Sequence, residues 1–572
     1  MSFRLLDSRT AALVFVAVLT TACRSNSTTA IERVGVLHFD NLSGDPQWDW
    51  LQTAAPKLWK SQLSGSRGAV AIALDSPSQV GALDLTRVIS GYFLTHGGKL
   101  RAHVGITDAA GSTTKTIDLS AADAVSLLEQ ISAQFGLPLR PLPSKNLEAL
   151  TAYGRGLSAK TQENSKVEFA KAAKADPAFG PAWLQLIELL QREADKPAVA
   201  TAAAQALAQK SLPGLERAEI LQLSLPDTAT TAQRLASMEA IAKELPADGS
   251  VAGKVAEFAV AARAFPNARE WYKTATQLLP DSPSLWNSKG YAEAFGGDLN
   301  GAVQSMRRYQ ALSPTDSNAN DSLGEVYYMY GRFAEAEASF LAGFAKQPNA
   351  LGGAMMRKAA WARLRSGDVA GAAKLFDQYL EFRKKNNDPF EPIERAQWEY
   401  LTGAQAAAKQ RLEKFASESK LPNAYGQLSL WARFEGDQPR AAQLAERAVA
   451  GLASSPQFRN SVAIAYVLAQ PNAPAPVWIQ RLNGSAAAAV GMLASGDYAG
   501  AAQFLEQVRA RINPLQEYYW RDLHAIALFR AGKKEEAKAL LRLYSLPETT
   551  EDSFLLCFAF PADQEIRRQL AK

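Results

Sequence analysis

The chain has 572 residues, of which 47% are hydrophobic and 21% are charged, and its formal net charge is +5. This length exceeds what one hydrophobic core supports, and the apolar content is ordinary for folded protein, so we expect several domains or a repeat array. Lysine and arginine are interspersed with aspartate and glutamate instead of forming basic runs, which argues against a nucleic-acid-binding surface.

Residues 1–22 have the pattern of a secretory signal peptide. Arg4 and Arg9 precede an apolar stretch of about a dozen residues, which is too short to span a bilayer but suits the hydrophobic region of such a signal. The stretch ends at Cys23, and a short polar sequence follows it. This arrangement resembles a bacterial lipoprotein signal that is cleaved before a cysteine, which implies that Cys23 carries a lipid and that residues 23–30 form a polar tether.

An ordinary cleaved signal, or an uncleaved helical anchor, is the alternative interpretation, and Cys23 is then a small apolar residue near the membrane surface. Both interpretations predict export. Arg24 is not the aspartate that marks inner-membrane retention in enterobacteria, so the resemblance favours the outer membrane. We therefore expect a lipid-anchored protein of the bacterial cell envelope that faces the periplasm.

Residues 31–137 alternate between short apolar runs and helical patterns, as small α/β domains do. A strand, a helix and a second strand predict a parallel crossover, and three further strands with glycine-containing turns predict an antiparallel meander. A closing helix is expected at 120–135. The expected strands are 33–39, 69–74, 88–93, 100–106 and 114–119, and the first helix is expected at 48–63.

The sequence from Val34 to Pro46, Val-Gly-Val-Leu-His-Phe-Asp-Asn-Leu-Ser-Gly-Asp-Pro, resembles the opening of the TolB-like α/β domain, which precedes tetratricopeptide repeats in many bacterial regulators. The sequences Ile-Ser-Gly-Tyr-Phe from Ile89 and Ile-Thr-Asp-Ala-Ala-Gly from Ile106 resemble its later hairpin. His38 stands in the first strand where that family usually has proline. In related proteins the domain can follow a kinase or DNA-binding domain, whereas here a signal peptide takes that place, which disfavours a cytoplasmic signalling role.

A proline-rich linker at 138–145 ends this domain, because its prolines cannot sustain a helix. From 146 to 572, alanine-rich helical patterns follow one another without strand-like stretches. Four prolines recur at intervals of 34 residues, which is the tetratricopeptide period. These prolines are Pro246, Pro280, Pro314 and Pro348.

Glycine and alanine landmarks keep the same period. Gly290 and Gly324 let paired helices approach closely, and a large apolar side chain such as Met306 or Phe340 fills the space between them. Turn glycines followed five residues later by alanine continue with looser spacing, so we predict about ten repeats, some of them degenerate. The looser copies are Gly367 with Ala372, Gly403 with Ala408, Gly436 with Ala441, Gly496 with Ala501, and Gly532 with Ala537. The predicted fold class is mainly α, a tetratricopeptide-type α-α solenoid preceded by a small α/β domain.

In tetratricopeptide arrays the first helices line a concave face, and their exposed side chains form a peptide groove. The family's groove positions carry over to nine residues of this chain. They are Asn287, Tyr291 and Phe295 in one repeat, Asp321, Glu325 and Tyr328 in the next, and Arg357, Trp361 and Arg365 in a third. The lysine and asparagine pattern by which some family members clamp a peptide carboxylate is missing from these positions.

Arg357, Trp361 and Arg365 are spaced by four along one helix face and would hold an acidic or aromatic segment through ion pairing and cation–π contact. The alternative is a solvated face with Trp361 packed inward. The two interpretations differ in whether these side chains are available to a partner.

The sequence carries no familiar catalytic or metal-binding pattern. Its four histidines are dispersed, and no His-Glu-x-x-His motif occurs. Two cysteines, Cys23 and Cys557, are too few for a cysteine-based zinc site or a disulfide framework. Neither a phosphate-binding loop nor a Gly-x-Ser-x-Gly elbow is present, so we predict no catalytic residues, no metal and no cofactor.

These features predict a protein that binds partners and is not an enzyme. The leading hypothesis is an exported, lipid-anchored scaffold whose repeats hold other envelope proteins or peptides, with the α/β domain as a second docking surface. The alternative is an envelope sensor or regulatory subunit whose α/β domain binds a small ligand or glycan. An unrecognised envelope hydrolase is the third class. The expected partners include the membrane, through the N-terminal lipid, and exclude nucleic acid.

Overall fold

The computed structural model describes residues 31–64, 69–74, 76, 79–80, 85–108, 110–470, 489, 492–493, 495–510, 512, 514–545 and 562–571. The chain divides into two compact units, unit 1 (Met1–Ala252) and unit 2 (Gly253–Lys572). The predicted signal peptide, the tether and Cys23 lie outside the described residues, as does Cys557. None of the described helices combines the length and the apolar character that a membrane span requires.

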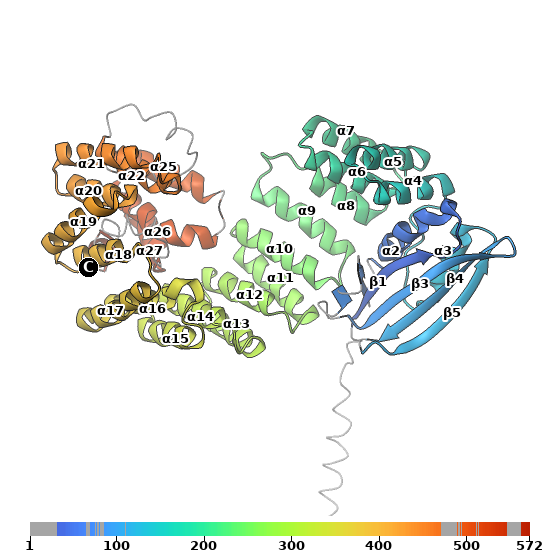
Figure 1. The fold of residues 1–572 in the computed structure, drawn as a ribbon, viewed down its shortest axis with the longest axis horizontal. Helices are drawn as coiled ribbons and strands as arrows, with labels where there is room; N and C mark the ends of the chain where they lie inside the picture. The colour runs from blue at the N-terminus through green and yellow to red at the C-terminus, as the bar shows by residue number, and fades with distance from the viewer. Residues whose placement is uncertain are drawn as a thin grey trace, which may run out of the picture. The chain divides into compact units, whose positions relative to one another are not determined.

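Unit 1 begins with a five-stranded sheet in the order β2-β1-β3-β4-β5. β1 pairs in parallel with both β2 and β3, while β3, β4 and β5 pair antiparallel, so the predicted crossover and meander are both confirmed. The helices α2 and α3 pack on one face of the sheet (Figure 1). The bounds are β1 (Glu32–Asn41), α2 (Asp49–Leu63), β2 (Ala69–Ala73), β3 (Arg87–His96), β4 (Lys99–Asp108), β5 (Thr113–Ala121) and α3 (Ala124–Ala133), with the short 3-10 helix η1 (Pro46–Trp48) before α2.

Aromatic side chains fill the space between the sheet and these helices. Trp59 on α2 is fully buried, its ring centroid lies 4.9 Å from that of Phe39 and 5.7 Å from that of Phe135, and its indole N–H donates to the Leu128 carbonyl. Gly91 on β3 is required beneath this layer, because a Cβ there would lie 2.2 Å from a β4 carbonyl oxygen. The alternating apolar pattern of the strands therefore places one sheet face in a closed core.

The proline-rich segment 138–145 is packed against the rest of unit 1. The Arg140 amide donates to the Gln62 carbonyl at the end of α2, the Arg140 guanidinium pairs with Glu216, and Leu142 is buried. The segment lies between α3 and the first repeat helix, and its contacts hold it in place, so it is not a free spacer.

The first repeat helix, α4 (Leu147–Ser158), packs directly on α2. Thr53 donates to the Gly154 carbonyl, and a Cβ at Gly154 would lie 2.6 Å from the Trp50 carbonyl oxygen. Buried residues of the sheet, of α2 and of the first repeats belong to one hydrophobic cluster. The remaining helices of unit 1 are α5 (Gln162–Ala175), α6 (Gly180–Arg192), α7 (Lys196–Leu207), α8 (Gly214–Leu223) and α9 (Thr231–Glu244), and α10 (Gly249–Ala261) crosses the division between the units.

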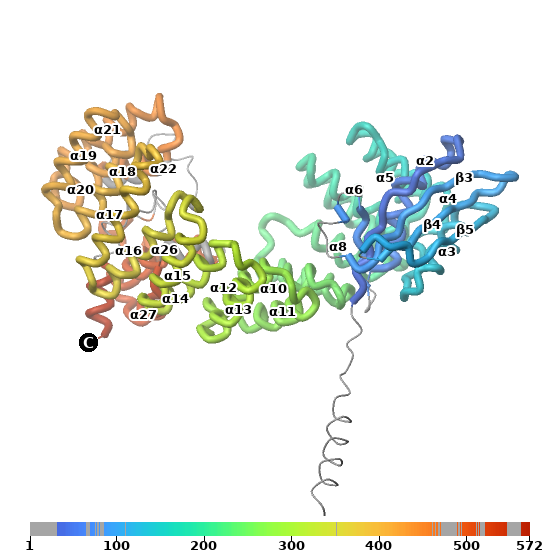
Figure 2. Tube along the Cα trace, turned by 60° about the horizontal axis from the view of Figure 1, so that its bottom comes forward, coloured from blue at the N-terminus to red at the C-terminus, as the bar shows by residue number. Residues whose placement is uncertain are grey.

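Unit 2 consists of successive antiparallel helix pairs (Figure 2). Its regular part comprises α11 (Phe265–Leu278), α12 (Pro283–Phe295), α13 (Leu299–Leu312), α14 (Asn318–Met329) and α15 (Phe333–Lys346). The later helices are α16 (Ala354–Arg365), α17 (Val369–Lys385), α18 (Glu391–Leu401), α19 (Gln405–Ser419), α20 (Pro422–Phe434), α21 (Gln438–Gly451), α22 (Arg459–Ala469), α25 (Tyr498–Arg509), α26 (Pro514–Arg530) and α27 (Lys534–Leu541), with 3-10 turns η3 (Ala350–Gly353) and η4 (Pro456–Phe458).

The periodic landmarks have the packing roles that the sequence predicts. A Cβ at Gly290 would lie 2.8 Å from Met306, and one at Gly324 would lie 2.5 Å from the Phe340 ring, so each large side chain fits against a glycine of the preceding helix. The looser copies follow the same rule: the turn glycines at 367, 403, 436, 496 and 532 all have a positive φ, and the alanines five residues after them are fully buried. The predicted solenoid, including its degenerate copies, is therefore confirmed in these described residues.

Candidate binding site in unit 2

Most of the predicted groove residues are buried. Asn287 and Tyr291 are partly exposed. The buried residues are Phe295, Asp321, Glu325, Tyr328, Arg357 and Trp361. Arg365 is partly exposed as a residue, but its side chain is only 4% exposed. The expectation that these positions offer exposed side chains is therefore not met. Trp361 packs inward, as the alternative held, but the solvated face of that alternative is not found, because the side chains of Arg357 and Arg365 are buried.

Three of the predicted positions meet in a buried polar ladder between successive first helices. The Tyr291 hydroxyl on α12 donates to Glu325 on α14 at 2.7 Å. The Lys358 ammonium on α16 lies 2.8 Å from an Asp321 oxygen and 2.6 Å from a Glu325 oxygen, and Lys358 is fully buried. Burial, and then the charge of Glu325, raises the pKa of Tyr291, so the hydroxyl keeps its proton and acts as the donor.

Trp361 belongs to an aromatic cluster between α16, α17 and α18. Its ring meets Trp398 edge to face at 5.5 Å, and Trp398 stacks on Phe376 at 4.1 Å. The small cavity beside Arg357 in this cluster measures about 20 Å³, which is room for a single water molecule. This place is a packed core and offers no room for a peptide.

Arg365 faces residues from the far end of the chain. Its guanidinium lies 2.6 Å from an Asp563 oxygen and 3.8 Å from an Asp522 oxygen, and Arg567 also pairs with Asp563 at 2.7 Å. Both aspartates are buried. The C-terminal part of unit 2 therefore lies against α16, where it covers the predicted groove.

A short non-helical stretch, Arg542–Ser545, completes this cover, and we call it the docked segment. The Tyr544 amide donates to the Met329 carbonyl at the C-terminus of α14 at 2.9 Å, and the Tyr544 ring meets Phe333 of α15 edge to face at 5.0 Å. Arg542 donates to the Phe295 carbonyl at 3.3 Å. Figure 2 shows α26 and α27, which precede this segment in the chain, beside the regular repeats.

An open cavity of about 380 Å³ adjoins the docked segment. Its lining combines apolar side chains with four arginines and three glutamates, so it presents both signs of charge beside hydrophobic groups. The lining residues are Arg263, Phe265, Phe295, Glu506, Arg509, Pro514, Glu517, Arg521, His524, Leu528, Glu536, Ala539, Leu540, Arg542 and Leu543. This cavity is our candidate binding site, and of the nine predicted residues it contains Phe295.

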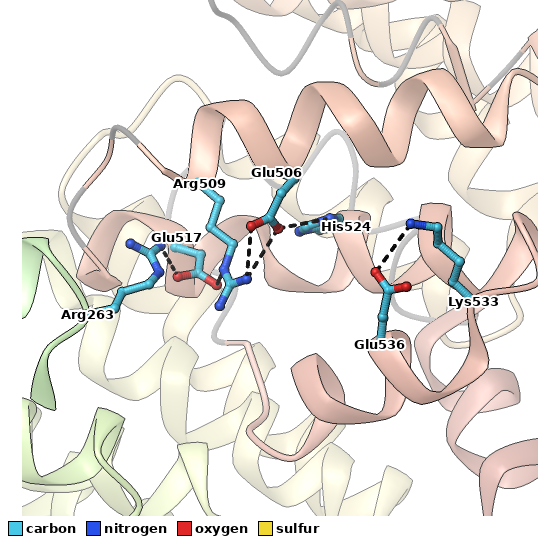
Figure 3. Close-up of polar contacts among 7 residues, drawn as sticks. All are labelled: Arg263, Glu506, Arg509, Glu517, His524, Lys533 and Glu536. Carbon is cyan, nitrogen blue, oxygen red and sulfur yellow. Dashed lines mark hydrogen bonds and ion pairs between the residues drawn. The ribbon is translucent and has the colours of Figure 1, made fainter. Parts of the chain in front are cut away.

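The charged side chains of the wall are paired in series, as Figure 3 shows. Arg263 pairs with Glu517, which also accepts a hydrogen bond from Arg509 at 2.9 Å. Arg509 reaches Glu506 at 3.2 Å, and the other neighbour of Glu506 is the imidazole of His524 at 3.8 Å. Because arginines and glutamates alternate, the wall matches a polar protein segment better than a ligand of one charge.

His524 sits deep in the wall of the cavity. Its side chain is buried, and burial lowers the pKa of the imidazole, so this residue is neutral at pH 7. Neither His524 nor any other charged member of the wall stood out in the sequence. Most of them lie on the consecutive helices α25 and α26, but Arg263 lies 254 residues before Glu517, so no local motif brings the set together. Within the described residues, no three histidine, cysteine, aspartate or glutamate side chains form a group that would hold a metal ion.

Asp522 and Asp563, the two buried aspartates that pair with Arg365, predict how the stability of the protein depends on pH. Burial, and then the charge of Asp563, raises the pKa of Asp522 to about 6, against the opposing effect of Arg365 and Arg567 and of a hydrogen bond with Ser545. The folded protein therefore binds a proton between about pH 4 and pH 6 that the unfolded chain releases, and stability falls as pH rises through this range.

We expect Asp522→Asn, which mimics the protonated acid, to match the wild type near pH 4 and to exceed its thermal midpoint at pH 7. Thermal unfolding followed by circular dichroism across this range measures the difference. A variant that is less stable than the wild type by a constant amount at every pH would contradict the prediction.

No protein-family model matches the chain, and no curated protein matches it either. Among solved structures, the MamA protein is 20% identical over 27% of this chain and 85% of its own, with a TM-score of 0.25. YrrB, described as a TPR protein with an unusual peptide-binding site, is 13% identical over 38% of this chain and 92% of its own, with a TM-score of 0.25. A tetratricopeptide repeat protein from Parabacteroides merdae is 13% identical over 41% of this chain and 93% of its own, with a TM-score of 0.29.

These similarities are too weak to transfer a function. The class of fold rests on the chain itself, whose helix pairs, glycine turns and buried alanines are those of a tetratricopeptide-type repeat array. The TolB-like resemblance of the α/β domain and the lipoprotein resemblance of the N-terminus stay predictions.

Proposed function

We propose that the protein is a non-catalytic scaffold of the bacterial cell envelope, anchored by a lipid on Cys23, whose second unit binds an extended segment of another envelope protein. The observation that carries this proposal is the docked segment, since the repeats of unit 2 already hold a short non-helical stretch through backbone and aromatic contacts. The adjoining open cavity, with its apolar side chains and mixed charges, supports binding of a protein segment at the same place.

Site-specific photo-crosslinking in native membranes tests this function. Glu536 lines the cavity, whereas its neighbour Glu535 on α27 is exposed but is not part of the cavity wall. A benzophenone amino acid at 536 should give a discrete adduct that mass spectrometry identifies as an envelope protein, and the same group at 535 should not. Equal labelling from both positions, or no adduct from 536, would count against the scaffold.

The lipid anchor makes a separate prediction. Radiolabelled palmitate should be incorporated into the wild type and into Cys557→Ser, and incorporation should be lost in Cys23→Ser, because the acyl chains would be attached at that thiol. Fractionation should then find the Cys23→Ser protein released from the membranes. Labelling that survives Cys23→Ser would show that the N-terminus is not a lipoprotein signal.

A sensor remains the second candidate function, and a partly exposed pair of side chains on β3 and β4, Tyr92 and His103, favours it. Tyr92 stacks on His103 with ring centroids 5.0 Å apart, and His103 Nδ1 lies 2.8 Å from Asp118 on the next strand. A partly exposed aromatic ring beside hydrogen-bonding groups suits a sugar or another small polar ligand. If Tyr92→Ala leaves binding to an envelope glycan array unchanged while Glu536 crosslinks persist, the scaffold is favoured over the sensor.

A further inference from the structure

The docked segment, Arg542–Ser545, is held by contacts that a bound peptide would make. The Tyr544 amide donates to the Met329 carbonyl (2.9 Å), and the Arg542 guanidinium donates to the Phe295 carbonyl (3.3 Å). The first bond joins two backbone groups, so any extended chain can form it whatever its sequence. Specificity must therefore come from the side chains of the segment.

Two of these side chains occupy selective positions. Leu543 is only 4% exposed and belongs to the core cluster of the repeats. The Tyr544 ring meets Phe333 edge to face, and the guanidinium carbons of Arg567 and Arg365 lie 3.8 Å and 5.4 Å from its centroid. A ring next to two cations gains cation–π stabilisation, which favours tyrosine or tryptophan over an aliphatic residue of similar size.

We propose that this face of α14 and α15 is a binding site for a partner segment in which an aliphatic residue is followed by tyrosine or tryptophan, and that Arg542–Ser545 is a built-in competitor for it. This inference rests on the proposed function, because it specifies the chemistry of the partner segment. The open cavity, which Arg542 and Leu543 also line, provides room for the partner residues that precede the aliphatic one.

Competition within one chain has a measurable consequence. A covalently attached segment acts at a high effective concentration, and a free peptide binds only the fraction of molecules whose own segment has left the site. The apparent dissociation constant rises by the inverse of that fraction. Weakening the docked segment should therefore tighten the binding of a free peptide, whereas a purely structural contact would give no such gain.

The test uses the full chain and a fluorescein-labelled, C-amidated peptide Leu-Leu-Arg-Leu-Tyr-Ser, which has the sequence of residues 540–545. Fluorescence polarisation should show that Tyr544→Ala binds this peptide roughly tenfold more tightly than the wild type does. A peptide with alanine in place of its tyrosine should not bind. Tyr498→Ala, which removes a tyrosine that contacts Arg530 elsewhere in unit 2, is the matched control and should behave as the wild type. A folded Tyr544→Ala protein with wild-type peptide affinity would overturn the proposal.

Hydrogen exchange on the wild-type protein decides the matter if Tyr544→Ala does not fold. The Tyr544 amide is bonded to the Met329 carbonyl, and a peptide that displaces the segment should increase exchange at that amide. Unchanged protection at a large peptide excess would overturn the proposal. Crosslinking from position 536 reports on partner binding independently. If a partner is captured there but the peptide does not displace the docked segment, the proposed scaffold function stands and only the competitor role of the segment is refuted.

Discussion

Replacing Lys358 by methionine should destabilise unit 2 locally by about 3–5 kcal/mol, because it leaves buried carboxylates without their cation. The Lys358 ammonium lies within 2.8 Å of oxygens of both Asp321 and Glu325, and all three residues are buried. Removing one partner of a buried ion pair costs far more than replacing the whole pair, since the remaining charges keep their desolvation penalty. Hydrogen exchange of the α14 and α16 amides measures this loss of stability in the helices that carry the three charged residues.

Two further variants separate charge from packing. Lys374 is exposed on the neighbouring α17, so Lys374→Met should change stability by less than about 0.5 kcal/mol. The triple variant Lys358→Met, Asp321→Asn, Glu325→Gln removes all three charges and should recover most of the loss. If Lys358→Met behaved like Lys374→Met, the buried ladder would have no energetic role.

The repeat array was predictable because its rules are local and recur. Three landmarks act within about one period: a glycine that admits a large side chain, an alanine at the start of the second helix, and a glycine in the turn. Gly324 with Phe340 illustrates the first, and Gly331 illustrates the turn. The same locality extends to Gly532, where the period itself has drifted. The crossover and the meander in the small sheet were predictable for a similar reason, since a helix and tight turns link these strands along the chain. The parallel pairing of β1 with β3, which joins the two parts, was not predicted.

The burial of the groove positions could not be predicted from the same rules. Arg365 pairs with Asp563, 198 residues later, and the amide that caps α14 belongs to Tyr544. No periodic pattern encodes these contacts. The positions that line an open groove in a regular array are therefore predicted to be exposed, although most of them are buried in this structure. The sequence held one indication of the role of Lys358. Asp321 and Glu325 share a helix face, and a lysine on the first helix of the following repeat can face them.

Unit 1 gives the other case in which long-range packing outweighs local signals. The prolines at 138–145 correctly predict the end of a helix, but they do not reveal that Leu142 is buried or that Gly154 lies against Trp50. The sequence thus predicts two domains with a spacer, whereas the contacts join the sheet and the first repeats in one hydrophobic cluster. Whether residues 31–137 fold separately is a question that a single core substitution answers.

Trp59→Ala should lower the stability of unit 1 by about 3–5 kcal/mol, because it removes a fully buried ring from its contacts with Phe39 and Phe135. Hydrogen exchange should show the loss of protection in α4 and α5 as well as in the sheet, since the cluster around Trp59 continues into both helices. The control Trp48→Ala alters a partly exposed ring at the edge of the cluster and should cost less. Protection that is lost only within residues 31–137 would mean that the α/β domain unfolds by itself, and the proline-rich segment would then be a true boundary despite its contacts. A loss shared with α4 and α5 would instead make the sheet the N-terminal cap of the array, which a solenoid requires to cover the open face of its first repeat.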